Sequence, residues 1–300
     1  MLNHLRNNKT FVIANDAGGA ENLFRITKKN KNLYTYYLSG PAKKIFPKVK
    51  NTCLSKIKEN IKNSDVLLCS TSFDNQIYYD AIQIAKKNRK YCAVLFDHWV
   101  NYSQRLRKKR NDLLPDEIIV VDIEAYKKVK KLYPKIKISL INNMYLNEYL
   151  DKVNKFMKNL RLSRTTALYC TNKIKKLESR YQNNKIKFNY DEFDAINFFL
   201  ENYKKIDPKI KKIILRIHPS ENSSKYNTII SKYKKVIPIM KDNKSDLSKQ
   251  IALCKFVIGC ETFPLVIACK SKKKVFYSIP PKGNKSLLPF KKIKYLRDII

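Results

Sequence analysis

Short, almost continuous apolar runs alternate along the chain with longer, lysine-rich stretches in which apolar residues recur at helical spacing. Such runs are typical of parallel strands buried on both faces, and the stretches between them are typical of the helices that cover such a sheet. The alternation therefore predicts an α/β fold with parallel sheets. The predicted strands occupy residues 10–15, 33–39, 65–70, 91–97, 117–122, 137–142, 166–171, 211–217, 235–240, 255–260 and 274–279.

The many predicted strands and the length of 300 residues favour two domains over one large sheet. Residues 151–165 are polar and lack strand character, which predicts a helix followed by a linker. Residues 172–190 are charged and predict a loop after the first strand of the second domain. We therefore expect two doubly wound, Rossmann-like domains, residues 1–155 and 165–300, whose parallel sheets face a central cleft.

The chain is strongly basic, with 63 Lys and Arg against 25 Asp and Glu and a formal net charge of +38. Such a surface attracts nucleic acid, anionic lipid headgroups or phosphorylated substrates. A genome rich in A and T would also enrich Lys, Asn, Ile and Tyr, so the charge alone leaves the partner open.

One dense basic run lacks the interleaved aromatic residues of a base-stacking platform, which favours a solvated or lipid-facing loop over a nucleic-acid clamp. We expect its members to be exposed, because dense like charge resists burial. They are Arg105, Arg107, Lys108, Lys109 and Arg110.

No apolar run approaches the roughly 20 residues that a membrane span needs, and the N-terminus lacks the core of a signal peptide. The seven cysteines lie mostly in apolar runs and form no CxxC pair, which argues against a zinc site or a disulfide framework. These features predict a cytoplasmic protein with buried, reduced thiols. A peripheral contact with an anionic membrane, at its inner face, is a further expectation.

Glycine is rare, with five in the chain, and several follow predicted strands. Gly18 and Gly19 lie in "NDAGGAEN" after the first strand, and Gly259 ends the run "FVIG". Ligands bind at the carboxyl ends of parallel strands, where glycine permits close backbone approach. The first of these turns is neither GxGxxG nor a P-loop, so it does not by itself indicate NAD or ATP.

Two acids flank the first glycine turn. Asp16, at the tip of the first strand, is a candidate catalytic residue. Gly18, Gly19 and Glu21 form a candidate glycine loop for an acceptor. Glu21 would equally fit a purely electrostatic role at the start of the following helix.

The run "AVLFDHWVNY" brings Asp97, His98 and the only tryptophan, Trp99, to the end of a buried strand. Asp97 or His98 could take a proton from a substrate hydroxyl, which makes both candidate catalytic residues. The structural alternative is that His98 and Trp99 only plug the base of a loop.

The apolar run 211–217 ends at His218 and Pro219, followed by Ser220 and Glu221. A histidine at this strand tip could hydrogen-bond a phosphate and protonate it as it leaves, since its ordinary pKa lies near neutrality. The structural alternative is a histidine that only satisfies the backbone of the turn.

A later strand ends at Gly259, after which Glu261 and Thr262 open a helix with Pro264 in its first turn. The free N–H groups of a helix N-terminus suit a phosphate, and Thr262 adds a hydroxyl. Glu261 could instead accept hydrogen bonds from ribose hydroxyls. The predicted nucleotide-sugar site therefore comprises His218, Pro219, Ser220, Glu221, Gly259, Glu261 and Thr262.

Two Rossmann-like domains with a nucleotide in the second resemble the GT-B glycosyltransferases. The pair His218-Pro219, with a Ser/Thr-bearing strand-to-helix turn, is similar to the bacterial sialyltransferases and polysialyltransferases. In that group the HP histidine and the Ser/Thr motif grip the CMP phosphate of the donor. At Cys260-Glu261-Thr262 only Thr262 matches the second motif.

The group's paired-acid-glycine motif, which carries its catalytic base, is absent, and Asp97 and Asp16 are the substitutes that this sequence offers. The same layout also resembles sugar-nucleotide epimerases and lipid-A-type or capsule transferases. The GT-B resemblance implies no bound metal and no cofactor besides the nucleotide sugar itself.

The leading hypothesis is an inverting glycosyltransferase that moves a sugar, with a nonulosonic acid as one candidate, from a nucleotide-activated donor to a surface glycan or lipid-linked glycan. The second is a sugar-nucleotide epimerase or hydrolase of the same architecture, in which His98 and Asp97 act on the sugar ring. The third is a basic nucleic-acid-binding protein. Buried parallel sheets and the lack of a known reader motif argue against it, so no specific nucleic acid is expected as a partner.

Overall fold

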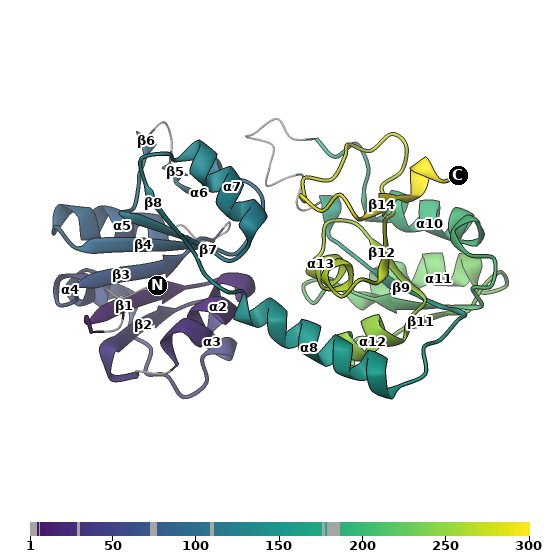
Figure 1. Ribbon diagram of the computed structural model, residues 1–300, viewed down its shortest axis with the longest axis horizontal. Coiled ribbons are helices and arrows are strands. Elements are labelled where there is room, and N and C mark those ends of the chain that lie inside the picture. The colour runs from purple at the N-terminus through teal and green to yellow at the C-terminus, as the bar shows by residue number, and fades with distance from the viewer. Residues whose placement is uncertain are drawn as a thin grey trace. The chain divides into compact units, whose positions relative to one another are not determined.

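A computed structural model describes residues 5, 7–28, 31–72, 77–108, 111–175, 178 and 187–300. The chain divides into two compact units, Met1–Tyr145 and Leu146–Ile300 (Figure 1). The division falls in the first turn of α8 (Met144–Asn159), which is followed by an irregular segment, as the predicted helix and linker require. The cleft expected between the two domains stays a prediction.

The N-terminal unit is built on a sheet of six strands in the order β2-β1-β3-β4-β7-β8, in which all neighbours are parallel. Its strands are β1 (Thr10–Ala14), β2 (Tyr34–Leu38), β3 (Val66–Ser70), β4 (Tyr91–Phe96), β7 (Glu117–Val120) and β8 (Lys137–Leu140). Its helices before α8 are α2 (Ala17–Thr27), α3 (Ala42–Ile45), α4 (Ile57–Lys62), α5 (Ile77–Lys87), α6 (Tyr102–Arg105) and α7 (Ile123–Leu132).

The C-terminal unit has a second six-stranded sheet in the order β11-β10-β9-β12-β13-β14, again with parallel neighbours throughout. Its strands are β9 (Thr166–Cys170), β10 (Lys212–Arg216), β11 (Ile239–Lys241), β12 (Phe256–Gly259), β13 (Lys274–Tyr277) and β14 (Lys294–Tyr295). Its helices after α8 are α10 (Glu192–Ile206), α11 (Asn227–Tyr233), α12 (Leu247–Leu253) and α13 (Phe263–Lys270). The predicted class, two doubly wound α/β units with parallel sheets, is confirmed.

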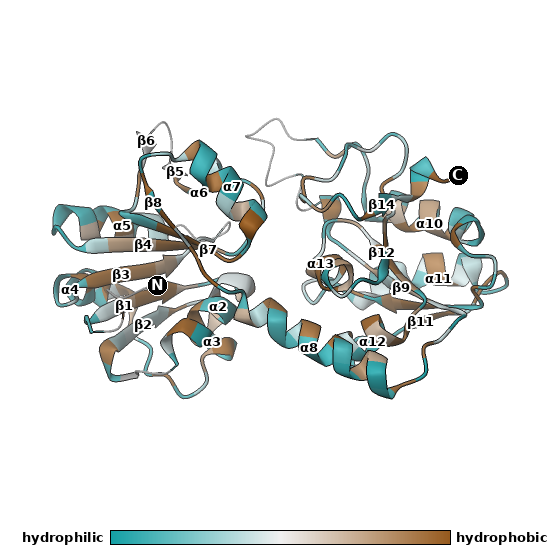
Figure 2. Cartoon of the chain, in the orientation of Figure 1, coloured by the Kyte–Doolittle hydropathy of each residue, from teal (hydrophilic) through white to brown (hydrophobic). Residues whose placement is uncertain are grey.

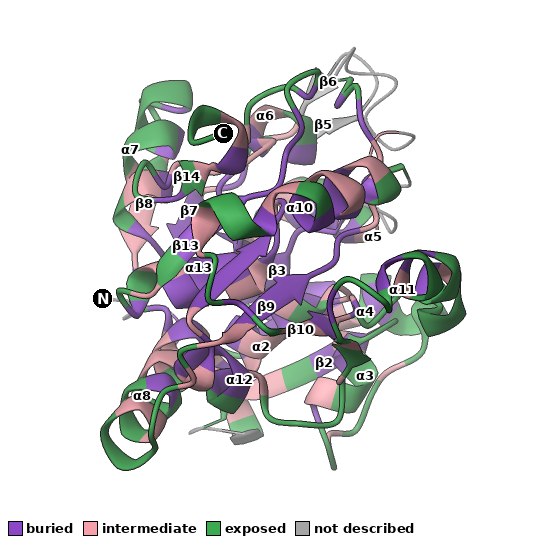
Figure 3. Ribbon diagram, turned by 90° about the vertical axis from the view of Figure 1, so that its right-hand side faces the viewer, coloured by how far each residue is buried: buried purple, intermediate pink, exposed green. Residues whose placement is uncertain are grey.

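The apolar runs of the sequence form the buried strands at the centre of each sheet. Every residue of β1, β3 and β12 is buried, and the strands stand out as hydrophobic and buried in Figures 2 and 3. In the C-terminal core the ring of Phe256 packs edge-on against Phe199 and Phe276, with ring centroids 6.3 and 5.5 Å apart. Removal of these apolar surfaces from water is the main stabilising term of each sheet.

In both sheets the first strand of the unit lies in the interior, with later strands on either side of it. The strand order therefore reverses between β1 and β3 in the N-terminal unit and between β9 and β12 in the C-terminal unit. Loops leave in opposite directions at such a switch point, which opens a crevice at the carboxyl ends of the strands.

Three details differ from the sequence-based expectation. The predicted strand 235–240 begins only at Ile239, because Pro238 has no N–H to donate and a turn at Tyr233 occupies the residues before it. The two-residue strand β14 and the antiparallel pair β5 (Arg107–Lys108) and β6 (Asn111–Asp112) were not predicted, since such short strands carry no periodicity. Most cysteines are buried thiols as expected, but Cys53 is exposed.

Gly259 ends β12 where the neighbouring strand leaves no room for a side chain. A Cβ built on it would lie 2.4 Å from the carbonyl oxygen of Cys170 and 3.2 Å from Leu265 Cδ1. We predict that Gly259→Ala lowers the free energy of unfolding by about 1–3 kcal/mol, because the backbone of β9 must shift. Chemical denaturation of the purified variant measures this loss.

Lys272 offers the matched control, because it is an exposed non-glycine residue with a φ of 60° just after α13. Lys272→Gly should raise the stability, since glycine adopts this conformation without strain. Equal stability of Gly259→Ala and the wild type would contradict the close approach of β12 to β9.

Candidate functional site

The candidate nucleotide site lies at the switch point of the C-terminal sheet. Thr171 and Asn172 follow β9, and Glu261 follows β12. The side-chain amide of Asn172 donates to the carbonyl oxygen of Glu261 at 3.2 Å and so joins the two loops. The neighbouring strand β10 adds the turn that begins at His218.

His218 is held by both its backbone and its ring. Its N–H donates to Thr171 Oγ1 at 2.8 Å, and its ring Nδ1 lies 3.2 Å from the N–H of Ser220 and 2.8 Å from Ser220 Oγ. A backbone N–H can only donate, so Nδ1 accepts, and the proton of the neutral ring is on Nε2. His218 therefore offers an N–H donor on the side of the ring that the turn does not occupy.

The ionisation of His218 follows from its surroundings. Desolvation lowers its pKa, the charge of Lys173 lowers it further, and the carboxylate of Glu221 raises it. The net shift is downward, so the imidazole is neutral near pH 7 and acts as a hydrogen-bond donor rather than a fixed cation.

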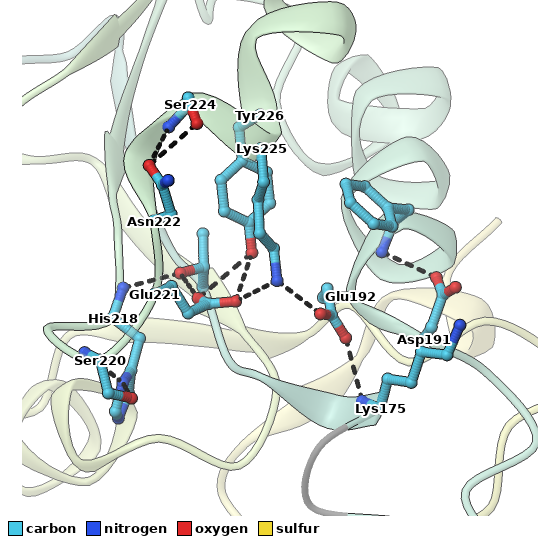
Figure 4. Close-up of polar contacts among 12 residues, drawn as sticks. Lys175, Asp191, Glu192, His218, Ser220, Glu221, Asn222, Ser224, Lys225 and Tyr226 are labelled. Atoms are coloured by element: carbon cyan, nitrogen blue, oxygen red, sulfur yellow. Dashed lines mark hydrogen bonds and ion pairs between the residues drawn. The ribbon is translucent and has the colours of Figure 1, made fainter.

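Glu221 does not face outward as a ligand-binding carboxylate would. Its side chain is 2% exposed. It accepts hydrogen bonds from the hydroxyls of Thr171 at 2.6 Å and Tyr226 at 3.1 Å, and Lys225 Nζ lies 2.5 Å away (Figure 4). This residue therefore belongs to the support of the His218 turn.

Glu261 and Thr262 lie at the start of α13, as predicted, with Pro264 in its first turn. Glu261 Oε1 accepts from the N–H of Leu287, and burial raises the pKa of the carboxyl group. Thr262 is the N-cap residue, but its hydroxyl makes no capping hydrogen bond and has no partner among the described residues. The first turn of α13 thus carries a buried hydroxyl that nothing in the described chain satisfies.

The N-terminal switch point carries a second polar cluster. Asn15 Nδ2 donates to Asp16 Oδ1 at 2.7 Å and to Ser72 Oγ at 3.0 Å, and the hydroxyl of Ser72 donates to Asp16 Oδ1 at 2.8 Å. The hydroxyl of Ser39, after β2, donates to Asn15 Oδ1 at 2.8 Å. These contacts join the loops after β1, β2 and β3.

The two adjacent glycines allow α2 to begin against these loops. A Cβ on Gly18 would lie 2.2 Å from Asp97 Oδ2, and one on Gly19 would lie 2.4 Å from Ser70 Cβ. The carboxylate of Asp97 consequently lies at the first turn of α2, whose dipole favours a negative charge there.

Asp97 and His98 form a pair in which the histidine is the accessible member. His98 Nε2 lies 3.3 Å from Asp97 Oδ2, and their side chains are 46% and 2% exposed, respectively. A neutral His98 with Nε2 facing the carboxylate keeps Nδ1 available to accept a proton. Trp99 is buried, as the plug alternative requires, but His98 is not.

Glu21 lies further along α2 and pairs with Arg25 at 2.5 Å on the same helix, so its placement fits a structural role as well.

The expectation of an exposed basic run is wrong for Arg105, which is buried and donates from Nη1 to Thr71 Oγ1 at 2.5 Å. Lys109 and Arg110 lie outside the described residues. For residues 107 and 108 only the backbone is described.

Sequence reasoning missed the polar residues that follow β1, β3 and β9. They are Asn15, Thr71, Ser72, Thr171 and Asn172. The dipeptides "TS" and "TN" directly after buried runs carried the signal.

Within the described ranges no group of three or more His, Cys, Asp or Glu could hold a metal ion. In the same ranges no helix has the length and apolarity of a membrane span.

The lowered pKa of His218 predicts a pH dependence of stability. As the pH falls below about 6.5, the unfolded chain takes up the proton first, so stability present above that pH is lost. In His218→Asn the side-chain oxygen can still accept from the N–H of Ser220 but cannot be protonated. We expect the melting temperature of this variant to fall less between about pH 7.5 and pH 5.5. Equal falls in both proteins would show that His218 is not desolvated.

No protein-family model matches the sequence, and no curated protein matches it. Solved UDP-GlcNAc 2-epimerases share the fold. The Methanocaldococcus jannaschii enzyme in complex with UDP-GlcNAc and UDP aligns with a TM-score of 0.58 and 12% identity, over 95% of this chain and 88% of that chain. The Neisseria meningitidis enzyme bound to UDP-GlcNAc aligns at 0.56 and 9%, over 89% and 81%. At such identities the similarity establishes the architecture of two Rossmann-like units. The reaction has to be argued from the residues of the site, because one fold can carry many activities.

Proposed function

We propose that this chain is an enzyme that acts on a nucleotide-activated sugar, and that the C-terminal unit holds the nucleotide at the β9–β12 switch point. The observation that carries the proposal is the state of His218. Its Nδ1 is engaged by Ser220 and its backbone by Thr171, which leaves Nε2–H as a preoriented donor. A donor of this kind suits a phosphate oxygen on which negative charge develops as the sugar departs.

The start of α13 provides the second part of the phosphate site. Its N–H groups and its dipole favour an anion, and the unsatisfied hydroxyl of Thr262 could donate to one. The carboxyl group of Glu261, which already accepts from the N–H of Leu287 and from the side chain of Ser286, is the candidate partner of a ribose hydroxyl. The solved enzymes of the same fold bind UDP and UDP-GlcNAc, which supports a nucleoside diphosphate as the ligand class.

In the N-terminal unit we assign proton transfer to His98, with Asp97 as its partner. The neutral imidazole accepts the proton of a hydroxyl at Nδ1, and the carboxylate then stabilises the imidazolium. Asp16, whose carboxylate already accepts from Asn15 and Ser72, is the second candidate for this base.

The reaction we favour is inverting glycosyl transfer to a hydroxyl of a glycan or lipid-linked glycan. The acceptor oxygen attacks the anomeric carbon, the bond from that carbon to the phosphate oxygen breaks, and the acceptor proton passes to a general base. The leaving phosphate keeps the bonding electrons and receives a hydrogen bond from His218. Epimerisation of the nucleotide sugar is the second candidate, because the solved structures that share the fold over most of the chain include UDP-GlcNAc 2-epimerases.

Replacement of His218 tests whether its Nε2–H group acts as a donor to the leaving phosphate. Loss of one hydrogen bond to a charged group is worth roughly 1.5–3 kcal/mol, so the turnover number of His218→Ala with saturating donor should fall about 10- to 150-fold. His218→Asn, which keeps a polar group, should recover donor binding more than turnover. Wild-type turnover in a folded His218→Ala protein would exclude His218 from the chemistry.

A thermal-shift screen identifies the nucleotide, and a reaction with donor alone identifies the class of enzyme. Among CMP, UDP, GDP and their sugars, the true ligand should raise the melting temperature by mass action. An epimerase or hydrolase converts the donor without an acceptor, whereas a transferase leaves it largely intact. A protein that no nucleotide stabilises, but that binds arbitrary duplex DNA in a salt-dependent manner, would refute the proposal.

A further inference from the structure

Two buried carboxylates and a partly buried ammonium group lie beside the His218 turn. The ammonium group of Lys225 lies 2.5 Å from Glu221 Oε1 and 2.5 Å from Glu192 Oε1. The side chains of the two glutamates are 2% and 9% exposed, and that of Lys225 is 25% exposed. Figure 4 shows Lys225 between the two carboxylates, with Glu221 on the side of His218.

These three groups join the two loops that form one side of the switch point. Glu221 reaches the loop after β9 through the hydroxyl of Thr171, which itself accepts from the N–H of His218. Glu192, in the first turn of α10, accepts from the N–H of Lys175 at 3.0 Å. Lys225 therefore connects the loop after β10 with two points of the loop after β9.

Lys225 and Glu192 are charged near neutral pH. Desolvation opposes the charge of Lys225, but its hydrogen bonds to Glu192 and Glu221 raise its pKa. Desolvation likewise opposes the charge of Glu192, yet the N–H of Lys175 and the ammonium of Lys225 lower its pKa. An ammonium group between two buried carboxylates compensates both charges, which favours this one arrangement of the two loops.

We propose that Lys225 is a positioning residue for the nucleotide site: by bridging Glu221 and Glu192 it fixes the turn of His218 and the loop after β9 in one arrangement. The ring of His218 is thereby presented with Nε2–H outward before the ligand arrives. Part of the inference, the effect on nucleotide affinity, rests on the proposed function. The effect on the His218 ring does not.

The test compares Lys225→Met with Lys282→Met. Lys282 also pairs with an acid in the first turn of α10, with Nζ 2.9 Å from Asp194 Oδ2, but this pair is exposed at 62% and 38%. The ring-nitrogen NMR signals are few, because the chain has three histidines, and His218→Asn assigns those of His218. The second measurement is the calorimetric affinity for UDP, CMP and GDP.

We expect Lys225→Met to move the His218 ring-nitrogen shifts toward those of a free imidazole. It should also weaken binding of the nucleotide on the order of tenfold, the loss of one oriented hydrogen bond. Lys282→Met should change neither. Lys225→Arg, which keeps the charge, should restore part of both effects.

A folded Lys225→Met protein with unchanged ring shifts overturns the inference. If Lys225→Met does not melt cooperatively, Lys225→Gln, which keeps a donor for one carboxylate, takes its place with the same criteria. If the wild type binds no nucleotide, the proposed function fails, while the ring shifts still decide whether Lys225 positions His218.

Discussion

Parallel hydrogen bonding between β9 and β12 is the constraint on which the C-terminal unit depends. These strands are far apart in the sequence, so their pairing brings the loop after β9 beside the start of α13. The approach is close enough that only glycine fits at position 259. The same pairing rule acts between β1 and β3, where it assembles Asn15, Asp16 and Ser72. Position at a switch point, rather than proximity in sequence, creates both polar clusters.

In each polar cluster a buried carboxylate lies close to a more exposed histidine. Glu221 lies beside the His218 turn, and Asp97 lies beside His98. At His218, desolvation outweighs the attraction of the Glu221 carboxylate, so the imidazole stays neutral near pH 7. The contacts of its Nδ1 with Ser220 hold the ring in one orientation, which is the condition for electrostatic preorganisation.

The parallel strands were predictable because a strand buried on both faces is a continuous apolar run. Such a run can be recognised in the sequence without knowing which strands pair with it. His218, Glu261 and Asp97 were predictable as strand-tip residues for the same reason. The direction in which a side chain points was not predictable. Glu221 was predicted as a ligand-binding residue and Arg105 as an exposed charge, but both side chains are buried with partners far along the chain. Lys225 and Glu192, 33 residues apart, carried no local signal at all.

Among the described residues, one cluster of buried apolar side chains draws on residues between Leu5 and Ile141, and another draws on residues between Ala167 and Leu296. All six strands of the first sheet are therefore synthesised before β9 leaves the ribosome. The N-terminal sheet can close while the rest of the chain is still being made, so its apolar strands are not exposed to those of the second sheet. Protease resistance of ribosome-bound chains that end near residue 190 would reveal this order, and uniform digestion of such chains would contradict it. The order of the two sheets along the chain thus protects against pairing of the wrong strands during translation.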